Sequence, residues 1–384
     1  MGTSAVGKGD RRVKALIVGP DIHGVSGEPT HIRTLLSSPL SEEFSLSYHR
    51  VGGGERRVVP ESFLRRNLVR LFSPAVLPFR LLIQRPRLVH INNTFNFKGL
   101  LRDCSLTLVA KLLARKVIFE MHGGHPEAWL SRHPAMRPFV ISALRRADRI
   151  IALSAEQERF LSGFLPKGRF RRIPNMVDPA QFSPSVPVEP PAFLYMGRLH
   201  EPKGIFVLLE AFGKLSGDFR LWFAGDGPDR ARLEKMIRDK GLSEKVRVLG
   251  FVLGEEKRRV LSSAYAMVLP SFHEGIPYAI LEGLASALPV IATAVGGVPD
   301  VIRDGTDGFL VPPGDPAALS SAMERLLSDR GLRDNIAVKA RERSFDFSVE
   351  RISAQYIEVY REVMAGAWNS PKDKRRRSTG SVRF

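Results

Sequence analysis

Short apolar runs, separated by stretches with helical periodicity, recur along most of this 384-residue chain. In the first half the runs occupy residues 13–18, 44–51, 88–92, 116–121 and 149–153. The pattern starts again later, with runs at residues 192–196, 219–224, 246–251 and 265–269. Alternating strands and helices predict parallel sheets with helices on both faces. We therefore expect two α/β domains, each a doubly wound parallel sheet, with ligands at the carboxyl ends of the strands.

Proline content suggests where the domains meet. Residues 183–191 contain four prolines, which is typical of an interdomain linker, and we place this linker at residues 184–191. The predicted domains then cover residues 13–183 and 192–345, followed by an amphipathic helix over residues 346–368. Residues 1–12 and the basic segment 369–384 are expected to be disordered.

Composition limits the environment of the chain. The apolar content of 43% is enough for two full cores. A single cysteine, Cys104, excludes an internal disulfide framework and fits a reducing cytoplasm. Residues 1–12 lack the apolar segment of a secretory signal, Val6 does not fit a myristoylation motif, and no apolar run approaches the ~18 residues that cross a bilayer. We expect a cytoplasmic protein, soluble or peripheral on the inner face of the membrane.

The formal charge of +18 is concentrated in the first half. Residues 1–185 contain 29 Lys and Arg against 14 Asp and Glu, a balance of +15, whereas residues 186–384 contain 29 against 26. Residues 61–87 interleave arginines with Phe, Leu and Val, which suits contact with an anionic membrane surface. Two ordinary packing helices with solvated arginines are the alternative. A basic domain also suits an anionic acceptor or nucleic acid, but no nucleic-acid-binding module is recognisable, and we expect no nucleic-acid partner.

The segment 270–283 (PSFHEGIPYAILEG) carries the clearest chemistry. It follows an apolar strand and leads into a helix predicted over residues 278–287, with Pro277 at its start. Free amides and the dipole at a helix start attract phosphate. Glu274 and Glu282 would repel phosphate and are better suited to accept hydrogen bonds from sugar or ribose hydroxyls. The segment therefore suits a ligand that has both phosphate and hydroxyl groups.

Glu274 and Glu282 resemble the E-x7-E signature of retaining glycosyltransferases, and the surrounding SFHEGIPYAILEGLASALPVIATAVGGVPDVI resembles glycosyltransferase family 4. Further segments similar to that family are GRLHEPKG at 197–204, AGDGP at 224–228, PNMVD at 174–178 and DGFLVPPGD at 307–315. The likeness is sharp from residue 195 to 316 and loose before about residue 170. It implies the GT-B arrangement, in which two Rossmann-like domains face each other across a cleft and a C-terminal helix crosses back to the first domain.

The resemblance assigns a nucleotide-sugar donor to the second domain. Arg198 and Lys203 would neutralise the diphosphate, and they would stabilise the transition state because the charge on the diphosphate grows as the sugar bond breaks. Glu274 would contact the transferred sugar and Glu282 the ribose. We count Glu274, Arg198 and Lys203 as catalytic. Further donor contacts would come from Gly24, Gly250, Phe251, Gly275, Ile276 and Pro277.

In the first domain, a strand end and a glycine-bearing loop are the candidate sites. His122 directly follows an apolar run and matches a histidine that the family often has near the donor sugar, so we count it as catalytic as well. Gly24 and Gly27 resemble the pair of glycines in the first loop of the family, although an ordinary tight turn is an equal alternative. The expected acceptor contacts are Ser26, Gly27 and Asn93.

The chain contains no Asp-x-Asp, so we expect no metal bridge to the diphosphate and no cofactor. A metal site would need a set such as His122 and His125 with His133 or Glu120. The glycine pair between the first two is poor scaffolding for fixed ligands, which disfavours that site. Front-side attack by the acceptor is at least as favoured as attack by Glu274, whose role as a nucleophile stays open.

The implied function is transfer of a hexosyl group, with retention, from a UDP- or GDP-linked sugar to a glycan or lipid-linked acceptor, as in cell-surface polysaccharide or glycolipid synthesis. A nucleotide-sugar epimerase of the same architecture is one alternative, which the Arg198/Lys203 and Glu274/Glu282 pattern disfavours. A basic membrane- or nucleic-acid-binding protein without catalysis, and a catalytically inactive homologue, are the others.

Overall fold

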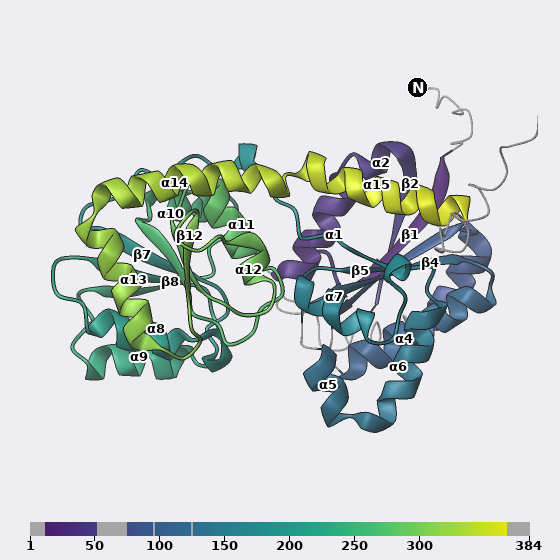
Figure 1. Ribbon diagram of the computed structural model, residues 1–384, viewed down its shortest axis with the longest axis horizontal. Helices are drawn as coiled ribbons and strands as arrows, with labels where there is room; N and C mark the ends of the chain where they lie inside the picture. The colour runs from purple at the N-terminus through teal and green to yellow at the C-terminus, as the bar shows by residue number, and fades with distance from the viewer. Residues whose placement is uncertain (1–11, 52–74, 95–96, 124–125, 367–384) are drawn as a thin grey trace, which may run out of the picture. The chain divides into compact units, whose positions relative to one another are not determined.

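The computed structural model describes residues 12–51, 75–94, 97–123 and 126–366, which belong to two compact units (Figure 1). Unit 1 is built from residues up to Leu153, from residues 157–173 and from Ser353 onward. Unit 2 is built from residues 154–156 and 174–352. The segments predicted to be disordered lie outside the described residues, except for Arg12, which donates to the carbonyl of Ser41.

Unit 1 contains a six-stranded parallel sheet in the order β2-β1-β3-β4-β5-β6. The strands are β1 (Val13–Gly19), β2 (Phe44–Arg50), β3 (Leu88–Thr94), β4 (Lys116–His122), β5 (Arg149–Ala152) and β6 (Phe170–Arg172). β1, β4 and β5 are buried along most or all of their length. Strands that are covered on both faces consist of continuous apolar residues. These runs are therefore easy to recognise in the sequence.

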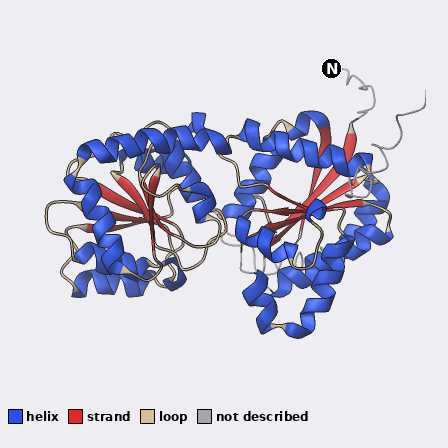
Figure 2. Cartoon of the chain, in the orientation of Figure 1, coloured by secondary structure: helices blue, strands red, loops and turns tan. Residues whose placement is uncertain are grey.

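Helices cover both faces of this sheet (Figure 2). They are α1 (Gly27–Ser37), α2 (Leu40–Glu43), a helix over residues 75–84, α4 (Phe97–Leu112), α5 (Pro126–Arg132), α6 (Arg137–Arg146), α7 (Ala155–Ser162) and α15 (Val349–Ala365). Figure 1 shows α1, α2 and α15 on one side of the sheet and α4 and α6 on the other. Leu100 and Cys104 of α4 share a buried core with Val140 and Leu144 of α6 and with the central strands.

Unit 2 repeats the architecture, with strand order β12-β11-β10-β7-β8-β9. The strands are β7 (Ala192–Met196), β8 (Arg220–Ala224), β9 (Val246–Gly250), β10 (Ala266–Leu269), β11 (Val290–Thr293) and β12 (Gly308–Val311). All pairings are parallel. The central strand β7 lies between β10 and β8, so the loops that follow β7 and β10 leave the same edge of the sheet side by side.

The helices of unit 2 are α8 (Ile205–Gly213), α9 (Arg230–Asp239), α10 (Gly254–Ser263), α11 (Tyr278–Ala285), α12 (Val298–Val301), α13 (Pro316–Ser328) and α14 (Arg330–Ser344). The apolar faces of α8, α9 and α13 form one core with the sheet, which includes Phe193, Phe212 and Phe223. Each fully buried side chain of this size contributes roughly 1.5–3 kcal/mol. α13 begins sharply because Asp315 accepts hydrogen bonds from two amides of its first turn and Pro316 starts the helix.

The predicted fold class, two doubly wound α/β domains, is confirmed. Two local details differ from the sequence-based expectation. α11 ends at Ala285 instead of residue 287, and Ala287 has a positive φ of 53°, which ends the helical path. β6 was not expected, because three residues give too short an apolar signal and its strand character comes from pairing with β5.

The division between the units falls after Ile173, ahead of the segment 184–191 that composition predicts as the linker. This segment is bonded to unit 2 through the backbone: the amides of Ser185, Val186 and Val188 donate to carbonyls of residues 286, 262 and 263. Prolines keep the segment out of the sheet, but these bonds pack it along the surface of unit 2. No helix among the described residues is long and apolar enough to cross a membrane.

Candidate active site

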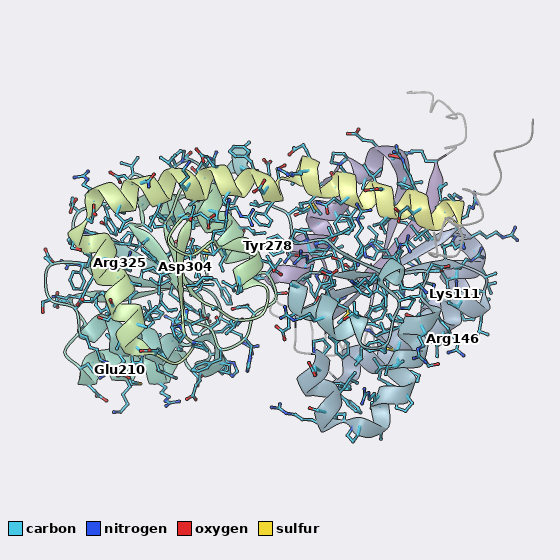
Figure 3. The ribbon with its side chains drawn as sticks, viewed as in Figure 1. Lys111, Arg146, Glu210, Tyr278, Asp304 and Arg325 are labelled. Carbon is cyan, nitrogen blue, oxygen red and sulfur yellow. The ribbon has the colours of Figure 1, made fainter. Side chains whose placement is uncertain are left out.

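The loop between β10 and α11 in unit 2 holds Glu274 and three of the predicted donor residues, Gly275, Ile276 and Pro277. β10 is fully buried, and its carboxyl end leads through residues 270–277 to α11. Pro277 is the N-cap of α11, whereas the sequence predicted it as the first helical residue. Because proline has no N–H, it leaves no unsatisfied donor at this helix end. Tyr278, labelled in Figure 3, is the first helical residue. The partial positive charge at this helix start suits a negatively charged group.

Two donors hold the Glu274 carboxylate. Lys203 Nζ lies 2.7 Å from Oε1, and the Ser271 hydroxyl donates to the same oxygen at 2.7 Å. The Glu274 side chain is only 11% exposed, so water screens this ion pair weakly. Oε2 accepts no hydrogen bond from the described residues. The carboxylate is therefore fixed through one oxygen and can accept a hydroxyl of a ligand through the other.

Two glycines allow the loops around Glu274 to approach one another. Gly204 has φ = +71°, and a Cβ built there would lie 1.9 Å from the carbonyl oxygen of Pro270. Gly296 has φ = +57°, and its Cβ would lie 1.7 Å from the carbonyl oxygen of Glu274. No side chain fits at either position. The contact at Gly204 brings the loop after β7, and with it Lys203, against the loop after β10, and the contact at Gly296 does the same for the loop after β11.

Arg198 lies on the same loop as Lys203 and is exposed. Its carbonyl accepts a hydrogen bond from the hydroxyl of Tyr195 at 2.8 Å, which anchors the backbone of the loop. Burial, together with the nearby Glu274 carboxylate, holds the pKa of Tyr195 well above its ordinary value, so this hydroxyl keeps its proton. Within the described part of the chain, the Arg198 guanidinium has no carboxylate partner. It is an uncompensated cation, available to an anionic ligand.

Glu282 lies in the second turn of α11 and is buried. Lys257 of α10 places Nζ 2.6 Å from Glu282 Oε1. Lys257 compensates the charge of the Glu282 carboxylate, and removal of this lysine would be strongly destabilising because it would leave a buried carboxylate without a cation. Sequence reasoning missed Lys257, because nothing in GEEKRRVLSS distinguishes it from its charged neighbours. It also missed Ser271, for which only its position three residues before Glu274 is a signal.

Of the two residues predicted to meet the nucleotide base, Gly250 ends β9 and Phe251 follows it. Gly250 has φ = +72°, a conformation that favours glycine, and its carbonyl accepts a hydrogen bond from the amide of Gly225 at 2.6 Å. The chain therefore turns sharply at the end of the strand. The Phe251 side chain is exposed beyond this turn.

The backbone of Gly275 and Ile276 is used within unit 2. The Gly275 carbonyl accepts from the amide of Gly297 at 3.0 Å, and the Ile276 carbonyl accepts from Asn175 Nδ2 at 2.7 Å. Asn175 belongs to the PNMVD segment, so that motif acts here by fixing the loop before α11. Both carbonyls are therefore occupied by hydrogen bonds within the protein.

In unit 1, His122 ends β4, and its side chain is 5% exposed. Nε2 lies 2.9 Å from Asn92 Oδ1 and 3.4 Å from Glu120 Oε1. Burial is the main cause that lowers the pKa of His122 to about 3, and the nearby His31 and His90 act in the same direction. The Glu120 carboxylate opposes this effect without reversing it. The imidazole is therefore neutral near pH 7.

The glycine-bearing loop after β1 is a tight turn that begins α1. The Gly24 amide donates to the carbonyl of Asp21 at 2.9 Å. Ser26 is the N-cap, and its carbonyl accepts from the amide of Thr30, but its hydroxyl makes no capping bond. Gly27 is the first helical residue. The Ser26 hydroxyl is therefore not used to cap the helix.

The sequence predicted that Asn93 contacts an acceptor, but the structure places its side chain in the core of unit 1. Its side chain is fully buried, and Nδ2 donates to Asp103 Oδ2 at 2.7 Å. Arg102 donates to both oxygens of the Asp103 carboxylate, from Nε to Oδ1 at 2.6 Å and from Nη2 to Oδ2 at 2.9 Å. Successive strand residues point to opposite faces of a sheet, so Asn93 enters the core beside α4 while Asn92 faces His122.

Of the metal ligands considered from the sequence, Glu120 and His122 lie together, with His122 Nε2 3.4 Å from Glu120 Oε1. His125 lies outside the described residues, and His133 Nδ1 bonds to the carbonyl of Trp129. The described residues contain one group with metal-ligating side chains in proximity, formed by His31, Glu120 and His122. Two of its members already form hydrogen bonds through atoms that could ligate a metal, since His122 Nε2 faces an amide oxygen and the Tyr356 hydroxyl donates to Glu120 Oε1 at 2.7 Å. A hydrogen-bonded network fits these contacts better than a set of ligands.

Two family models match the chain. The model described as Glycosyltransferase Family 4 matches residues 31–181, and the model described as Glycosyl transferases group 1 matches residues 177–343. Together the matches run from α1 to the end of α14, and they include both the His122 region and the loops around Glu274.

Curated proteins also resemble the chain. The lipopolysaccharide core biosynthesis glycosyltransferase LpsE of Rhizobium meliloti is 34% identical over 215 residues, which are 56% of this chain and 61% of that protein. The alpha-D-kanosaminyltransferase of Streptomyces kanamyceticus is 36% identical over 177 residues, 45% of this chain and 46% of that protein. The chain thus spans about half the length of the curated relatives it matches.

Solved structures share the fold over nearly the whole chain. Sucrose-phosphate synthase from Thermosynechococcus elongatus has a TM-score of 0.76 at 22% identity and covers 93% of this chain and all of that one. Anabaena Alr3699/HepE, solved in complex with UDP, has a TM-score of 0.73 at 16% identity and covers 91% of this chain and all of that one. At these identities the likeness shows the fold alone, the two-domain α/β fold called GT-B.

Proposed function

Because the chain belongs to the group 1 glycosyltransferases of family 4, we propose that it transfers a sugar from a nucleoside diphosphate sugar, UDP- or GDP-linked, to a glycan or lipid-linked acceptor with retention at the anomeric carbon. Relatives named for lipopolysaccharide core and colanic acid biosynthesis support an acceptor of the cell-surface polysaccharide class. A structural neighbour solved with UDP-glucose supports a nucleotide-sugar donor.

The observation that carries this proposal is the group of Lys203, Glu274 and Arg198 near the start of α11. A diphosphate binds where cations and free amides meet, and this place supplies one paired cation, one cation without a partner and a helix N-terminus. When the sugar bond breaks, negative charge increases on the leaving diphosphate. Cations fixed beforehand in a weakly screened place stabilise that state more than the bound donor, and this difference accelerates the reaction.

Glu274 would then contact the transferred sugar through Oε2. Because Lys203 and Ser271 both bond to Oε1, the carboxylate keeps one orientation and the remaining oxygen can accept a sugar hydroxyl. Glu282, held by Lys257, would accept the ribose hydroxyls in the same way. The proposal leaves attack on the anomeric carbon to the acceptor and assigns Glu274 the role of an essential sugar contact.

We further propose that donor binding does not require a metal ion, because Arg198, Lys203 and the start of α11 supply the positive charge that a bridging cation would provide. Calorimetric titration with UDP, GDP, ADP and dTDP, first in EDTA and then with magnesium, tests donor class and metal independence together. We expect one nucleotide to bind in EDTA. Binding of none, or binding only with magnesium, would contradict the donor site.

Retention is tested on the product. The nucleotide that binds identifies a short series of donors, and the anomeric configuration of the sugar in donor and product is compared by proton NMR of the anomeric signal. We expect the same configuration in both. Conversion of the nucleotide sugar to its epimer without any acceptor would instead favour the epimerase alternative.

An exposed apolar surface on the helix over residues 75–84 supports the proposed membrane contact. Phe79 is 67% exposed and Ile83 is 80% exposed, while Leu77 and Leu81 on the opposite side of the helix are buried in the core of unit 1. The arginines that follow, at positions 85 and 87, are exposed. Apolar side chains beside arginines suit an anionic leaflet, where the former enter the interface and the latter meet lipid phosphates. Residues 61–74 of the predicted segment lie outside the described residues.

A further inference from the structure

A buried polar network lies in unit 1 that the proposed function leaves unused. At its centre the Glu120 carboxylate of β4 has no exposed surface. The titratable groups that face it come from α1, β3, β4 and α15, and they are His31, His90, His122, Tyr356 and Tyr360. No lysine or arginine contacts this carboxylate among the described residues. A buried charge in such surroundings is expensive unless every neighbouring group is placed to stabilise it.

Each oxygen of the Glu120 carboxylate has a close neighbour, and only Oε1 accepts a hydrogen bond from the described residues. The Tyr356 hydroxyl donates to Oε1 at 2.7 Å, and His90 Nε2 lies 2.8 Å from Oε2 in a close but bent contact. On its other side His90 Nδ1 lies 2.7 Å from the Tyr360 hydroxyl. Burial opposes ionisation of Glu120, but the neighbouring histidines, His31 foremost, outweigh it and hold the pKa of this carboxyl well below its ordinary value. Glu120 is therefore an anion.

Asn92 determines which nitrogen of His122 carries the proton. Its Nδ2 donates to the carbonyl of Val18 at 3.2 Å, so its Oδ1 is the atom that faces His122 Nε2 at 2.9 Å. An amide oxygen only accepts hydrogen bonds, as does the Glu120 oxygen 3.4 Å from the same nitrogen. Two acceptors facing Nε2 require a proton there. Nδ1 has no hydrogen-bond partner among the described residues.

We propose that Asn92 and Glu120 are positioning residues that fix His122 as the neutral tautomer with its proton on Nε2, so that Nδ1 offers a lone pair to a hydroxyl group of the sugar or acceptor. The assignment of the ligand as a hydroxyl of a sugar rests on the proposed function, whereas the tautomer does not. An imidazolium would instead donate from both nitrogens and attract phosphate. The network thus gives His122 a different chemical preference from Arg198 and Lys203.

The tautomer is measured on the full chain, labelled with 15N-histidine, by long-range proton–nitrogen NMR between pH 5 and 8. We expect His122 to show a protonated Nε2 and an unprotonated Nδ1 throughout. Tyr360→Phe is the control, because it removes a hydroxyl from the far side of the same network and should leave the His122 signals in place. A proton on Nδ1, or titration of wild-type His122 in this range, would overturn the proposal.

Asn92→Asp tests the positioning role. The added carboxylate at Nε2 favours the imidazolium, so we expect His122 to titrate at higher pH and turnover to acquire an acidic limb that is absent from the wild type, with at least a tenfold loss of turnover at pH 5.5. An unchanged His122 spectrum and pH profile in a folded variant would exclude Asn92 as the determinant. If the variant does not fold, the wild-type spectrum still decides the tautomer.

Two further measurements separate the possible failures. Calorimetry first identifies which of UDP-glucose, UDP-galactose and GDP-mannose binds. Addition of that nucleotide sugar should then shift the Nδ1 signal of His122. Binding without any shift would refute the contact with a hydroxyl, while absence of binding would count against the proposed function and not against the tautomer.

Elemental analysis of protein purified without chelator should find no stoichiometric zinc. One equivalent of zinc per chain, whose removal by chelator changes the His122 signals, would overturn the proposal. A metal-bound Nε2 carries no proton.

Discussion

At the residue scale, the Lys203–Glu274 ion pair is the contact with the most direct consequence for catalysis. In the protein without donor, the ammonium group neutralises a carboxylate that is only 11% exposed. In the proposed function, a bound diphosphate would add a second anion near the same cation, and part of the attraction would transfer from Glu274 to the phosphate as the sugar bond breaks. The carboxylate remains held by Ser271 while this happens.

Lys203→Ala should lower turnover about 100- to 1000-fold, the cost of removing one preorganised group that stabilises transition-state charge. Lys214→Ala is the matched control, because that lysine belongs to the same unit and forms only an exposed pair with Glu210, labelled in Figure 3. It should stay within about twofold of the wild type. Steady-state rates with the identified donor, together with thermal unfolding, provide the comparison. Near-normal turnover in a folded Lys203→Ala protein would refute the site.

At the scale of elements, two glycines with nearly the same backbone conformation differ in their surroundings. Gly204 has φ = +71° and its Cβ would meet the Pro270 carbonyl oxygen at 1.9 Å, while Gly241 has φ = +66° and nothing within 4 Å of its Cβ. Gly241→Ala should therefore cost about 1 kcal/mol from conformation alone. Gly204→Ala adds a clash with backbone and should cost about 1–3 kcal/mol more. Urea unfolding measures the difference, and equal losses would show that the loops are free to separate.

Gly204→Ala should also reduce turnover, because separating the two loops moves Lys203 away from Glu274. Gly241→Ala leaves that contact in place and should retain normal rates. The same pair of variants therefore distinguishes a loss of stability from a loss of site geometry.

The helix over residues 75–84 is the element through which membrane contact is testable. Phe79→Ser combined with Ile83→Ser should weaken sedimentation with vesicles that contain anionic phosphatidylglycerol, because both side chains leave water on binding. Leu112→Ser is the control, since Leu112 is 85% exposed but lies at the end of α4. Wild-type binding should also fall with salt, as expected for an electrostatic contribution from the arginines. Identical sedimentation of all three proteins would exclude this surface.

At the scale of the whole molecule, buried titratable groups make stability depend on pH. The pKa of His122 falls from 6.5 to about 3 on folding, so the unfolded chain takes up this proton first. The associated stability is complete above about pH 6.5 and is lost as the pH falls toward 3, by up to about 1.4 kcal/mol per pH unit. Glu120, whose pKa is also lowered on folding, adds a loss in the same direction below about pH 4.5.

His122→Gln checks this pH dependence, because glutamine keeps a donor for Asn92 but does not titrate. The free energy of unfolding of the full chain in urea should fall less steeply between pH 7 and 5 in the variant than in the wild type. The difference in slope should correspond to nearly one proton. Equal slopes in the two proteins would show that His122 contributes nothing to the pH dependence, and would place its pKa near the ordinary value.

The sequence by itself determined the two α/β domains, because buried parallel strands leave continuous apolar runs. It also determined the family, because segments such as GRLHEPKG and HEGIPYAILEG keep their order and spacing. Tertiary structure alone decided which side chains pair. Lys257 meets Glu282 across 25 residues, and Tyr360 meets His90 across 270. Periodicity and spacing describe neighbours along the chain, whereas these contacts depend on how separate elements pack. The roles of Lys257, Ser271 and the Glu120 network were therefore absent from the sequence pattern and became visible only in the fold.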